Sequence, residues 1–268
     1  MTAARPGARS PEGSRDREVA LALELAALAR PIVLRHFRSP LAVDTKPDRS
    51  PVTIADRDAE AAMRAAIARR FPNHGVIGEE HGRDRADAEF VWVLDPIDGT
   101  KSFITGKPLF GTLIALAERG RPVVGVIDMP ALNECWWGAD DRGTLMNGAP
   151  VQTRPCGDLA QAMLYATTPH MFHGADEAAF ARLAAAVRHP LYGADCYAYA
   201  MVAGGWSDLV VEAMLQAYDF CALVPVVEGA GGVMSDWQGR PLTTASDGRV
   251  VACGDARLHG PVLERLAG

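Results

Sequence analysis

Hydrophobic positions along the chain fall into two patterns, and the first has the period of a helix. Apolar residues recur every three or four positions over residues 19–37, which predicts an amphipathic helix that Pro31 could kink. A second helix is predicted over residues 55–70, because Thr53 is a favourable N-cap and a phenylalanine-proline pair follows the last helical position.

After residue 70 the pattern changes to short apolar runs separated by turn signals. The runs FVWVLD, TLIALAE, PVVGVID and ECWWG predict consecutive strands. Polar segments rich in glycine and proline, such as ERGRP at residues 118–122, mark the turns between them. Residues 140–151, DDRGTLMNGAPV, predict one more hairpin that closes the first half of the chain.

The second half alternates between strand and helix. Strands are predicted near residues 163–167, 208–212, 233 and 250, and helices near 176–188, 197–203, 219–229 and 257–266. This alternation predicts an α/β protein in which helices are layered on sheets. Residues 1–17 are rich in proline, glycine and serine, so we expect a flexible tail there. Residues 18–268 are expected to form one domain. The pattern breaks at residues 152–159, which divides this domain into halves 18–151 and 152–268.

Composition narrows the class of protein. The 268 residues are 49% hydrophobic, and the net charge of −6 from 27 Lys+Arg and 33 Asp+Glu argues against nucleic-acid binding. No apolar run approaches the roughly 20 residues of a membrane span, and the basic N-terminus lacks the apolar centre of a secretory signal. The five cysteines form no CxxC pair, which is typical of reduced thiols and of a cytoplasmic protein.

One apolar run ends in residues that an ordinary turn does not need. In VWVLDPIDGTKSF, residues 91–103, Asp95, Asp98 and Thr100 stand around a proline and a glycine. The proline and the glycine are explained by a turn. Two acids at the end of a buried strand are not, and they indicate a functional site.

Three other stretches also carry an acid or a lysine at the end of a predicted element: TKPDRSPVTIAD, VIGEEH and AYDF. If Glu79, Asp95, Asp98 and Asp219 meet in space, they would hold a pair of Mg²⁺ ions, because Mg²⁺ prefers oxygen ligands. Two such ions can polarise a phosphate ester and activate a water, which is the chemistry of phosphoester hydrolysis. Each acid also has a structural alternative, as a surface charge, a turn residue or, for Asp219, a helix N-cap.

These motifs resemble the inositol monophosphatase family, the lithium-sensitive, Mg²⁺-dependent phosphatases, over residues 19–266. WVLDPIDGT and the later YDFCALVPVVEGAGG carry the resemblance, with Tyr218 where the family usually has a tryptophan. The resemblance implies a layered α-β-α-β-α sandwich, a homodimer, and a small-molecule phosphate ester as substrate. The first half would bind metal and phosphate, and the second half would recognise the substrate.

The resemblance also implies roles for single residues. Two or three Mg²⁺ ions would be held by Glu79, Asp95, Asp98, Asp219 and the carbonyl of Ile97. Thr100 and Asp56 would orient the attacking water, without a phosphoenzyme, and Glu79 would take part in catalysis. The backbone amides of Gly99 and Thr100 would bind phosphate at a helix start. Lys46 matches a family lysine near the catalytic loop, although a solvated surface lysine is an alternative reading.

Two carboxylates of the second half bear on the substrate. Glu212 lies where the inositol enzymes keep a glutamate for a substrate hydroxyl, and Asp195 lies where they usually have a small neutral residue. Together they would favour a cationic alcohol such as L-histidinol. DPIDGTKSFITGKP and DCYAY resemble the histidinol-phosphatase branch, so we expect a histidinol-phosphatase of histidine biosynthesis. The alternatives are an inositol-1-monophosphatase, a broad-specificity sugar phosphatase and, for Asp195 alone, a helix N-cap.

The remaining candidates carry weaker signals. His170 and His173 stand three apart in a predicted loop, without the further ligands that a zinc site needs. Tyr197, Tyr199 and Trp206 could stack on an imidazole, but such aromatic residues are more often core. A non-catalytic protein that kept the fold is disfavoured, because none of the expected acids is missing.

Overall fold

The computed structural model describes residues 15–40, 43–45 and 51–268. Two α-helices, α1 (Asp16–His36) and α2 (Ile54–Arg70), pack against each other and against one face of a large sheet. Both were predicted, although α1 begins three residues earlier than the periodicity indicated and includes Pro31 without interruption. Thr53 is the N-cap of α2, as predicted.

The large sheet has eight strands in the order β10-β9-β8-β7-β6-β5-β3-β4. The strands are β3 (Gly75–Gly78), β4 (Gly82–Asp84), β5 (Phe90–Asp98), β6 (Gly111–Glu118), β7 (Arg121–Met129), β8 (Glu134–Ala139), β9 (Arg142–Met146) and β10 (Ala149–Pro150). The four predicted strands and the predicted hairpin are confirmed, whereas β3 and β4 were not predicted. β3 runs parallel to β5, so the two strands end at the same edge of the sheet.

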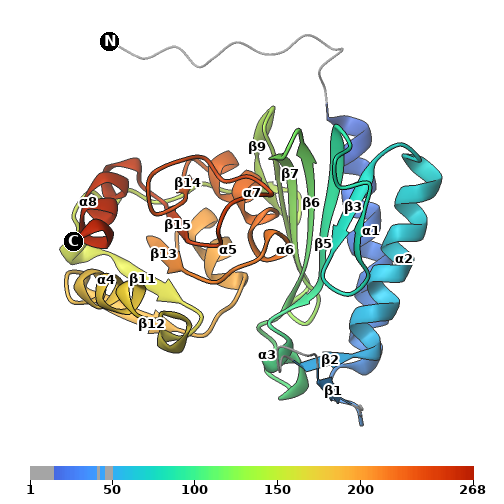
Figure 1. Cartoon of the computed structure of the whole chain (residues 1–268), viewed down its shortest axis with the longest axis horizontal. Helices are drawn as coiled ribbons and strands as arrows, with labels where there is room; N and C mark the ends of the chain where they lie inside the picture. Colours follow the sequence, from blue (N-terminus) through green and yellow to red (C-terminus); the bar gives the residue numbers. More distant parts are fainter. Residues whose placement is uncertain (1–14, 41–42, 46–50) are drawn as a thin grey trace.

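Two short elements lie at this same edge. A hairpin of β1 (Val43–Thr45) and β2 (Pro51–Thr53), which was not predicted, leads directly into α2. The helix α3 (Thr100–Ile104) follows β5 and contacts β2. Figure 1 shows the hairpin and α3 together at one end of the sheet.

The second sheet has five strands in the order β12-β11-β13-β15-β14. They are β11 (Met163–Ala166), β12 (His189–Tyr192), β13 (Leu209–Glu212), β14 (Val233–Ser235) and β15 (Val250–Cys253). β12 was not predicted. β11 and β13 are parallel neighbours, so the segments that follow them leave the sheet at one edge.

The remaining helices complete the layers. α5 (Tyr197–Ala203), α6 (Ala217–Phe220) and α7 (Leu223–Gly229) lie between the two sheets, and α4 (Ala175–Ala184) and α8 (Ala256–Ala267) cover the outer face of the second sheet. The helix predicted over residues 219–229 is two helices, because Pro225 has no N–H to bond to the carbonyl of Cys221. The helix predicted over 176–188 ends earlier, at Ala184.

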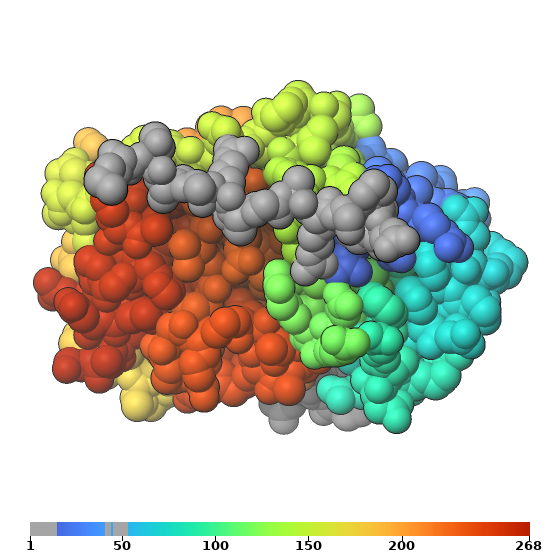
Figure 2. Space-filling view, turned by 90° about the horizontal axis from the view of Figure 1, so that it is seen from above, coloured from blue at the N-terminus to red at the C-terminus, as the bar shows by residue number. Residues whose placement is uncertain are grey.

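The order of layers is therefore α-β-α-β-α, the predicted fold class. Figure 2 shows the N-terminal helices and the C-terminal helix at opposite ends of the molecule. The apolar core between the sheets takes side chains from both halves of the chain, including Val93, Trp136 and Val226. None of the described helices is long and apolar enough to cross a membrane.

Candidate active site

The parallel pairing of β3 and β5 brings the first two acids together. Glu79 follows β3 directly, and its backbone N–H donates to the carbonyl of Leu94 on β5 at 3.2 Å. Asp95 is the next residue after Leu94, and β5 continues from there to Asp98. The edge of one sheet therefore presents Glu79, Asp95 and Asp98.

These acids line a cavity of about 350 Å³ between the two sheets. Six other predicted site residues also line this cavity, namely Ile97, Gly99, Thr100, Asp195, Glu212 and Asp219. Cys196, from the DCYAY motif, lines it as well. Sequence reasoning missed several further lining residues, namely Lys101, Thr167, Met171, Met214, Leu215 and Leu223. Lys101 directly follows the recognised motif, and this adjacency was the one signal available in the sequence.

Asp95, Asp98 and Asp219 form a cluster that could hold a metal ion. One carboxylate oxygen from each lies within 4.8 Å of the others. Burial raises the pKa of Asp95 well above its ordinary value, and the charges of Glu79, Asp98 and Asp219 raise it further. Burial and the charges of Asp195 and Asp219 raise the pKa of Asp98 in the same way.

A divalent cation fits this donor set. Buried carboxylates of like charge are costly unless a positive charge compensates them. The cavity is lined by carboxylates and by Ile97, whose carbonyl also faces the Thr100 hydroxyl, and hard cations prefer such oxygen ligands. The arrangement of these acids therefore favours binding of a cation.

Asp219 also has a local structural role. It is the third residue of the short helix α6, and its Oδ2 accepts a hydrogen bond of 2.6 Å from the backbone N–H of Gln216, the N-cap. Asp219 is therefore not itself the N-cap, which was the structural alternative. The capping contact instead fixes the direction of the side chain that joins the cluster.

Thr100 and Asp56 are both held by local hydrogen bonds. The Thr100 hydroxyl donates to the carbonyl of Ile97 at 3.1 Å. Asp56 is buried, and its Oδ2 accepts from the backbone N–H of Thr53 at 2.9 Å and from the Thr53 hydroxyl at 2.6 Å. Burial raises the pKa of Asp56, and the charge of Glu79 adds to this effect. The joint role of Thr100 and Asp56 stays a prediction.

Gly99 is required by its backbone and by its neighbours. It caps α3 with a φ of +80°, in the left-handed region that favours glycine. A Cβ atom there would lie 3.1 Å from the Asp195 carboxyl carbon and 3.1 Å from the carbonyl of Leu109. A side chain at this position would therefore be strained by its backbone and would press on the Asp195 carboxylate and the Leu109 carbonyl.

Asp195 is packed against this motif instead of capping the next helix. The N-cap of α5 is Cys196, whereas the Asp195 carboxylate accepts a hydrogen bond of 3.1 Å from the Ser102 hydroxyl. Burial raises the pKa of Asp195, while the Ser102 hydrogen bond and the charges of Lys107 and Lys101 lower it. Asp195 therefore lies in the cavity with cationic side chains nearby.

Glu212 ends β13 and is buried in the cavity wall. Its Oε1 accepts from the backbone N–H of Thr167 at 2.7 Å, and its Oε2 accepts from the Tyr199 hydroxyl at 2.9 Å. Burial raises the pKa of Glu212, which these two hydrogen bonds partly offset. Tyr199 is thus a hydrogen-bond donor in the cavity wall.

The weaker candidates lie elsewhere. Tyr197 and Trp206 do not line this cavity, and Trp206 packs edge-on against Trp136 with ring centroids 5.7 Å apart. Within the described ranges, the group that could hold a metal contains neither His170 nor His173. Lys46 lies outside the residues that the structure describes.

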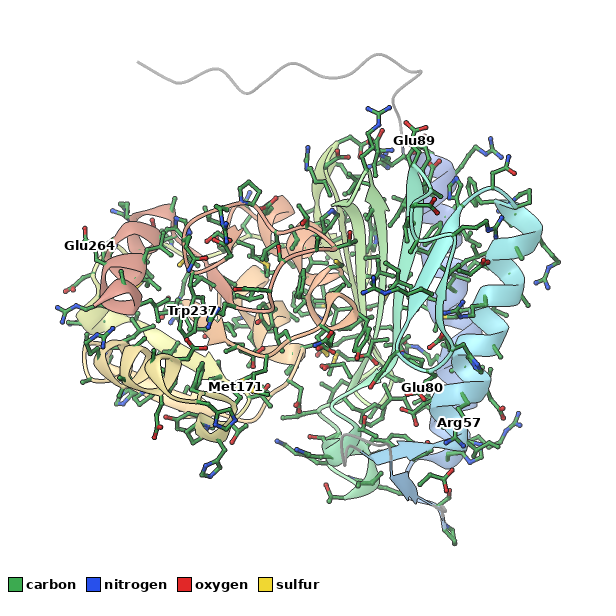
Figure 3. All side chains as sticks on the ribbon, viewed as in Figure 1. Arg57, Glu80, Glu89, Met171, Trp237 and Glu264 are labelled. Atoms are coloured by element: carbon green, nitrogen blue, oxygen red, sulfur yellow. The ribbon has the colours of Figure 1, made fainter. Side chains whose placement is uncertain are left out.

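A buried carboxylate supports the turn that carries Glu79. Glu60 of α2 is fully buried and accepts from the backbone N–H groups of Glu80 at 2.7 Å and His81 at 3.1 Å. Arg64, one turn further along α2, donates to the same carboxylate at 2.6 Å. Figure 3 labels Glu80 at the end of the sheet where α3 also lies. Sequence reasoning missed Glu60, because its position in a helix carries no sign of its distant partners.

A layered fold with four acids in a cavity between two sheets is typical of a class of metal-dependent phosphatases. The chain belongs to the inositol monophosphatase family, whose sequence profile matches residues 15–267. The members of this family are phosphatases that act on small phosphate esters.

Individual relatives extend this assignment. The chain is 48% identical over 260 residues to the bifunctional phosphatase IMPL2, chloroplastic, of Arabidopsis thaliana, covering 94% of this chain and 75% of that protein. It is 37% identical over 237 residues to the histidinol-phosphatase of Chlorobaculum parvum, covering 88% and 92%. A solved inositol monophosphatase from Zymomonas mobilis superimposes with a TM-score of 0.88 at 47% identity, covering 97% and 100%.

Proposed function

We propose that this protein is a Mg²⁺-dependent histidinol-phosphatase, which hydrolyses L-histidinol phosphate to L-histidinol and phosphate in histidine biosynthesis. The observation that carries the proposal is the position of Asp195 in the same cavity as the acid cluster of Asp95, Asp98 and Asp219. The similarity to the Chlorobaculum histidinol-phosphatase supports the same substrate.

Glu79, Asp95, Asp98, Asp219 and the carbonyl of Ile97 would hold two or three Mg²⁺ ions. Bound there, Mg²⁺ would supply Lewis-acid stabilisation of the charge that develops on the phosphoryl and leaving oxygens. The mutual repulsion of the buried acids supports this assignment, because each cation would relieve it.

The other residues of the motif would position the reactants. The backbone N–H groups of Gly99 and Thr100, at the start of α3, would bind the phosphate. The Thr100 hydroxyl and the Asp56 carboxylate would orient the attacking water, and the carboxylate would receive its proton. Lys101, which also lines the cavity, would add a positive charge beside the phosphate.

Direct attack by water makes a stereochemical prediction. The five cysteines are free, and burial raises the pKa of the one in the cavity, Cys196, well above its ordinary value, so it is a poor nucleophile. A chiral phosphate ester hydrolysed in ¹⁸O-water should therefore give inversion at phosphorus. Retention would indicate a phosphoenzyme and contradict this mechanism.

The leaving alcohol would lie against the second half of the chain. Asp195 would attract the ammonium group of histidinol, and Glu212 would form part of the same wall. Glu212 is buried and Asp195 is partly buried, so an opposite charge would interact with them more strongly than in water.

Phosphate release from a panel of esters tests the proposal. With Mg²⁺ present, histidinol phosphate should give the highest kcat/KM among histidinol phosphate, inositol-1-phosphate, fructose-1,6-bisphosphate and adenosine-2′-phosphate. A chelator should remove the activity, and added Mg²⁺ should restore it. Preference for a neutral alcohol would favour the second candidate, an inositol-1-monophosphatase or broad-specificity sugar phosphatase, which the similarity to the Zymomonas protein supports.

Two further proposals concern the protein's surroundings. A homodimer rests on the family resemblance alone. A cytoplasmic location rests on the five free cysteines, while the Arabidopsis relative is named as chloroplastic. Sedimentation of the purified protein and localisation of a tagged chain in its own cell would test the two proposals separately.

A further inference from the structure

Met214 has an unusual backbone for an apolar residue. Its φ is +65°, and the other non-glycine residues with positive φ in the described part of the chain are arginine, asparagine and aspartate. Asparagine and aspartate tolerate this region, whereas a bulky residue is strained there. Such strain persists only where the surrounding structure enforces it, and it is found most often at functional sites.

The Met214 side chain is also unusually exposed. It is 63% exposed, the highest value for a large hydrophobic residue among those the structure describes. It nevertheless lines the cavity that contains the acid cluster. The strained backbone therefore holds an exposed apolar side chain in the lining of the cavity, where a bound ligand could contact it.

The topology of the second sheet places a second methionine in the lining of the same cavity. β11 and β13 are parallel neighbours, and the hydrogen bond from Thr167 to Glu212 joins their ends. Met171, in the short turn η3 (Pro169–Met171), follows β11, and Met214 follows β13. Both methionines line the cavity, and Figure 3 labels Met171 on the side of the smaller sheet.

The residue after Met214 is fixed by a backbone hydrogen bond and by packing against the core. The N–H of Leu215 donates to the carbonyl of Gly248 at 3.1 Å, and Leu215 packs against the core between the sheets. Leu215 also lines the cavity. The strained residue is thus anchored on its C-terminal side, and its side chain remains at the cavity mouth.

We propose that Met171 and Met214 form an apolar wall that receives an unsaturated ring of the leaving alcohol, and that this wall selects ring-bearing phosphate esters over polyhydroxylated ones. This inference rests on the proposed phosphatase function and names the class of substrate that the site prefers. The imidazole of histidinol belongs to that class, as does a phenyl ring.

The chemistry of the two sides of the cavity supports this preference. Thioethers are polarisable and make favourable contacts with aromatic rings. A polyhydroxylated alcohol in the same place would lose hydrogen bonds to water against side chains that cannot replace them. The Glu212 oxygens already accept hydrogen bonds from Thr167 and Tyr199, so they are less able to replace the hydrogen bonds that substrate hydroxyl groups lose to water.

The test measures the ratio of kcat/KM for phenyl phosphate to that for glycerol-2-phosphate. We expect Met214→Gly to reduce this ratio about tenfold, mainly through the KM of phenyl phosphate, because small apolar contacts discriminate by about tenfold or more. Glycine adopts a φ of +65° without strain, so the melting temperature should not fall. Met171→Ala should change the ratio in the same direction, and the double variant should change it most.

Met146→Ala is the matched control. Met146 is a partly buried methionine of β9 that packs on the core between the sheets but does not line the cavity, so its loss should leave the ratio unchanged. If Met214→Gly and Met171→Ala change both substrates by equal factors, or leave the ratio as in the wild type, the wall does not exist.

A binding measurement separates this inference from the proposed function. Phenylphosphonate and methylphosphonate cannot be hydrolysed, and calorimetry with Mg²⁺ present compares their affinities directly. A preference for phenylphosphonate that Met214→Gly removes would support the wall even if no ester were hydrolysed. Equal affinities in the wild type would overturn the wall even if histidinol phosphate proved to be the substrate.

Discussion

At the scale of single residues, Gly99 and Asp195 fit each other across the two halves of the chain. The missing side chain of Gly99 makes room for the Asp195 carboxylate, which in turn accepts the Ser102 hydrogen bond. The cavity therefore depends on small local fits between its phosphate side and its leaving-group side. Changes to one residue should have distinct effects on metal binding and on substrate choice.

Loss of one carboxylate from the acid cluster should abolish hydrolysis while the fold remains. Asp98→Asn should lower kcat by roughly a thousandfold, because metal ions provide several kcal/mol of transition-state stabilisation. The amide oxygen can still accept the hydrogen bond from the N–H of Cys196, which is 2.7 Å long in the wild type. Phosphate release and far-UV circular dichroism measure the two effects. Near-normal activity with Mg²⁺ would contradict the metal assignment, and the exposed Asp87→Asn is the control.

Removal of the charge at Asp195 should change substrate choice. Asp195→Asn keeps a residue that tolerates the observed φ of +49°, and it should reduce the kcat/KM for histidinol phosphate about ten- to a hundredfold relative to inositol-1-phosphate. The reason is the loss of an ionic hydrogen bond to the substrate ammonium. Asp195→Ala should act in the same direction. An equal loss for both substrates would mean that Asp195 serves only the metal and phosphate side.

At the scale of elements, turns and helix ends position the site, and their partners are distant in the sequence. Glu60 of α2 holds the turn after β3, and Gly78 lies so close to its carboxylate that a Cβ would be 2.0 Å from Oε1. The position of the turn that carries Glu79 therefore depends on how closely α2 packs against the sheet.

Glu60→Gln should weaken Mg²⁺ binding about tenfold, because groups that orient metal ligands typically affect affinity by 10–100-fold. Calorimetric titration of the metal-free protein with Mg²⁺ measures the dissociation constant independently of activity. Asp236→Asn is a matched control, since Asp236 also accepts from two backbone N–H groups, of Gln238 and Arg240, and pairs with an arginine four residues later. Equal Mg²⁺ affinity in both variants would show that Glu60 serves only stability.

The sequence predicted the elements whose signals are local. The Thr53 cap and the apolar run before Asp95 identified α2 and β5, and the acids of DPIDGT were identified as candidate metal ligands. β3 and β12 were missed because β3 begins and ends with glycine and β12 contains Pro190, and both residue types argue against a strand. Met214 was missed because backbone strain and exposure become visible only in three dimensions.

At the scale of the whole molecule, two sheets close over a cluster of like charges. Burial and mutual repulsion raise the pKa values of Asp95 and Asp98 in the folded protein above their ordinary value. The folded state then binds more protons than the unfolded state at intermediate pH, so these acids make the metal-free fold less stable as the pH rises. A Mg²⁺ ion held by these acids would bind the folded state and so oppose this loss.

In the presence of a chelator, the melting temperature should therefore fall as the pH rises from about 5 to about 8, the range above the ordinary pKa of aspartate. The fall should be smaller in Asp95→Asn/Asp98→Asn and smaller again in the wild type with Mg²⁺. Differential scanning calorimetry of the three samples at both pH values makes the comparison. Parallel curves for wild type and variant would show that the two acids titrate normally.

The composition of the acid cluster has a consequence for the order of events during synthesis. Asp95 and Asp98 belong to the first sheet, whereas Asp219 arrives with α6, after most of the second sheet has left the ribosome. Until then a growing chain could bury only part of the ligand set, and the N–H of Cys196 would not yet meet Asp98. Of the proposed metal ligands only Asp219 belongs to the second half, so the full ligand set would exist only once both halves have come together.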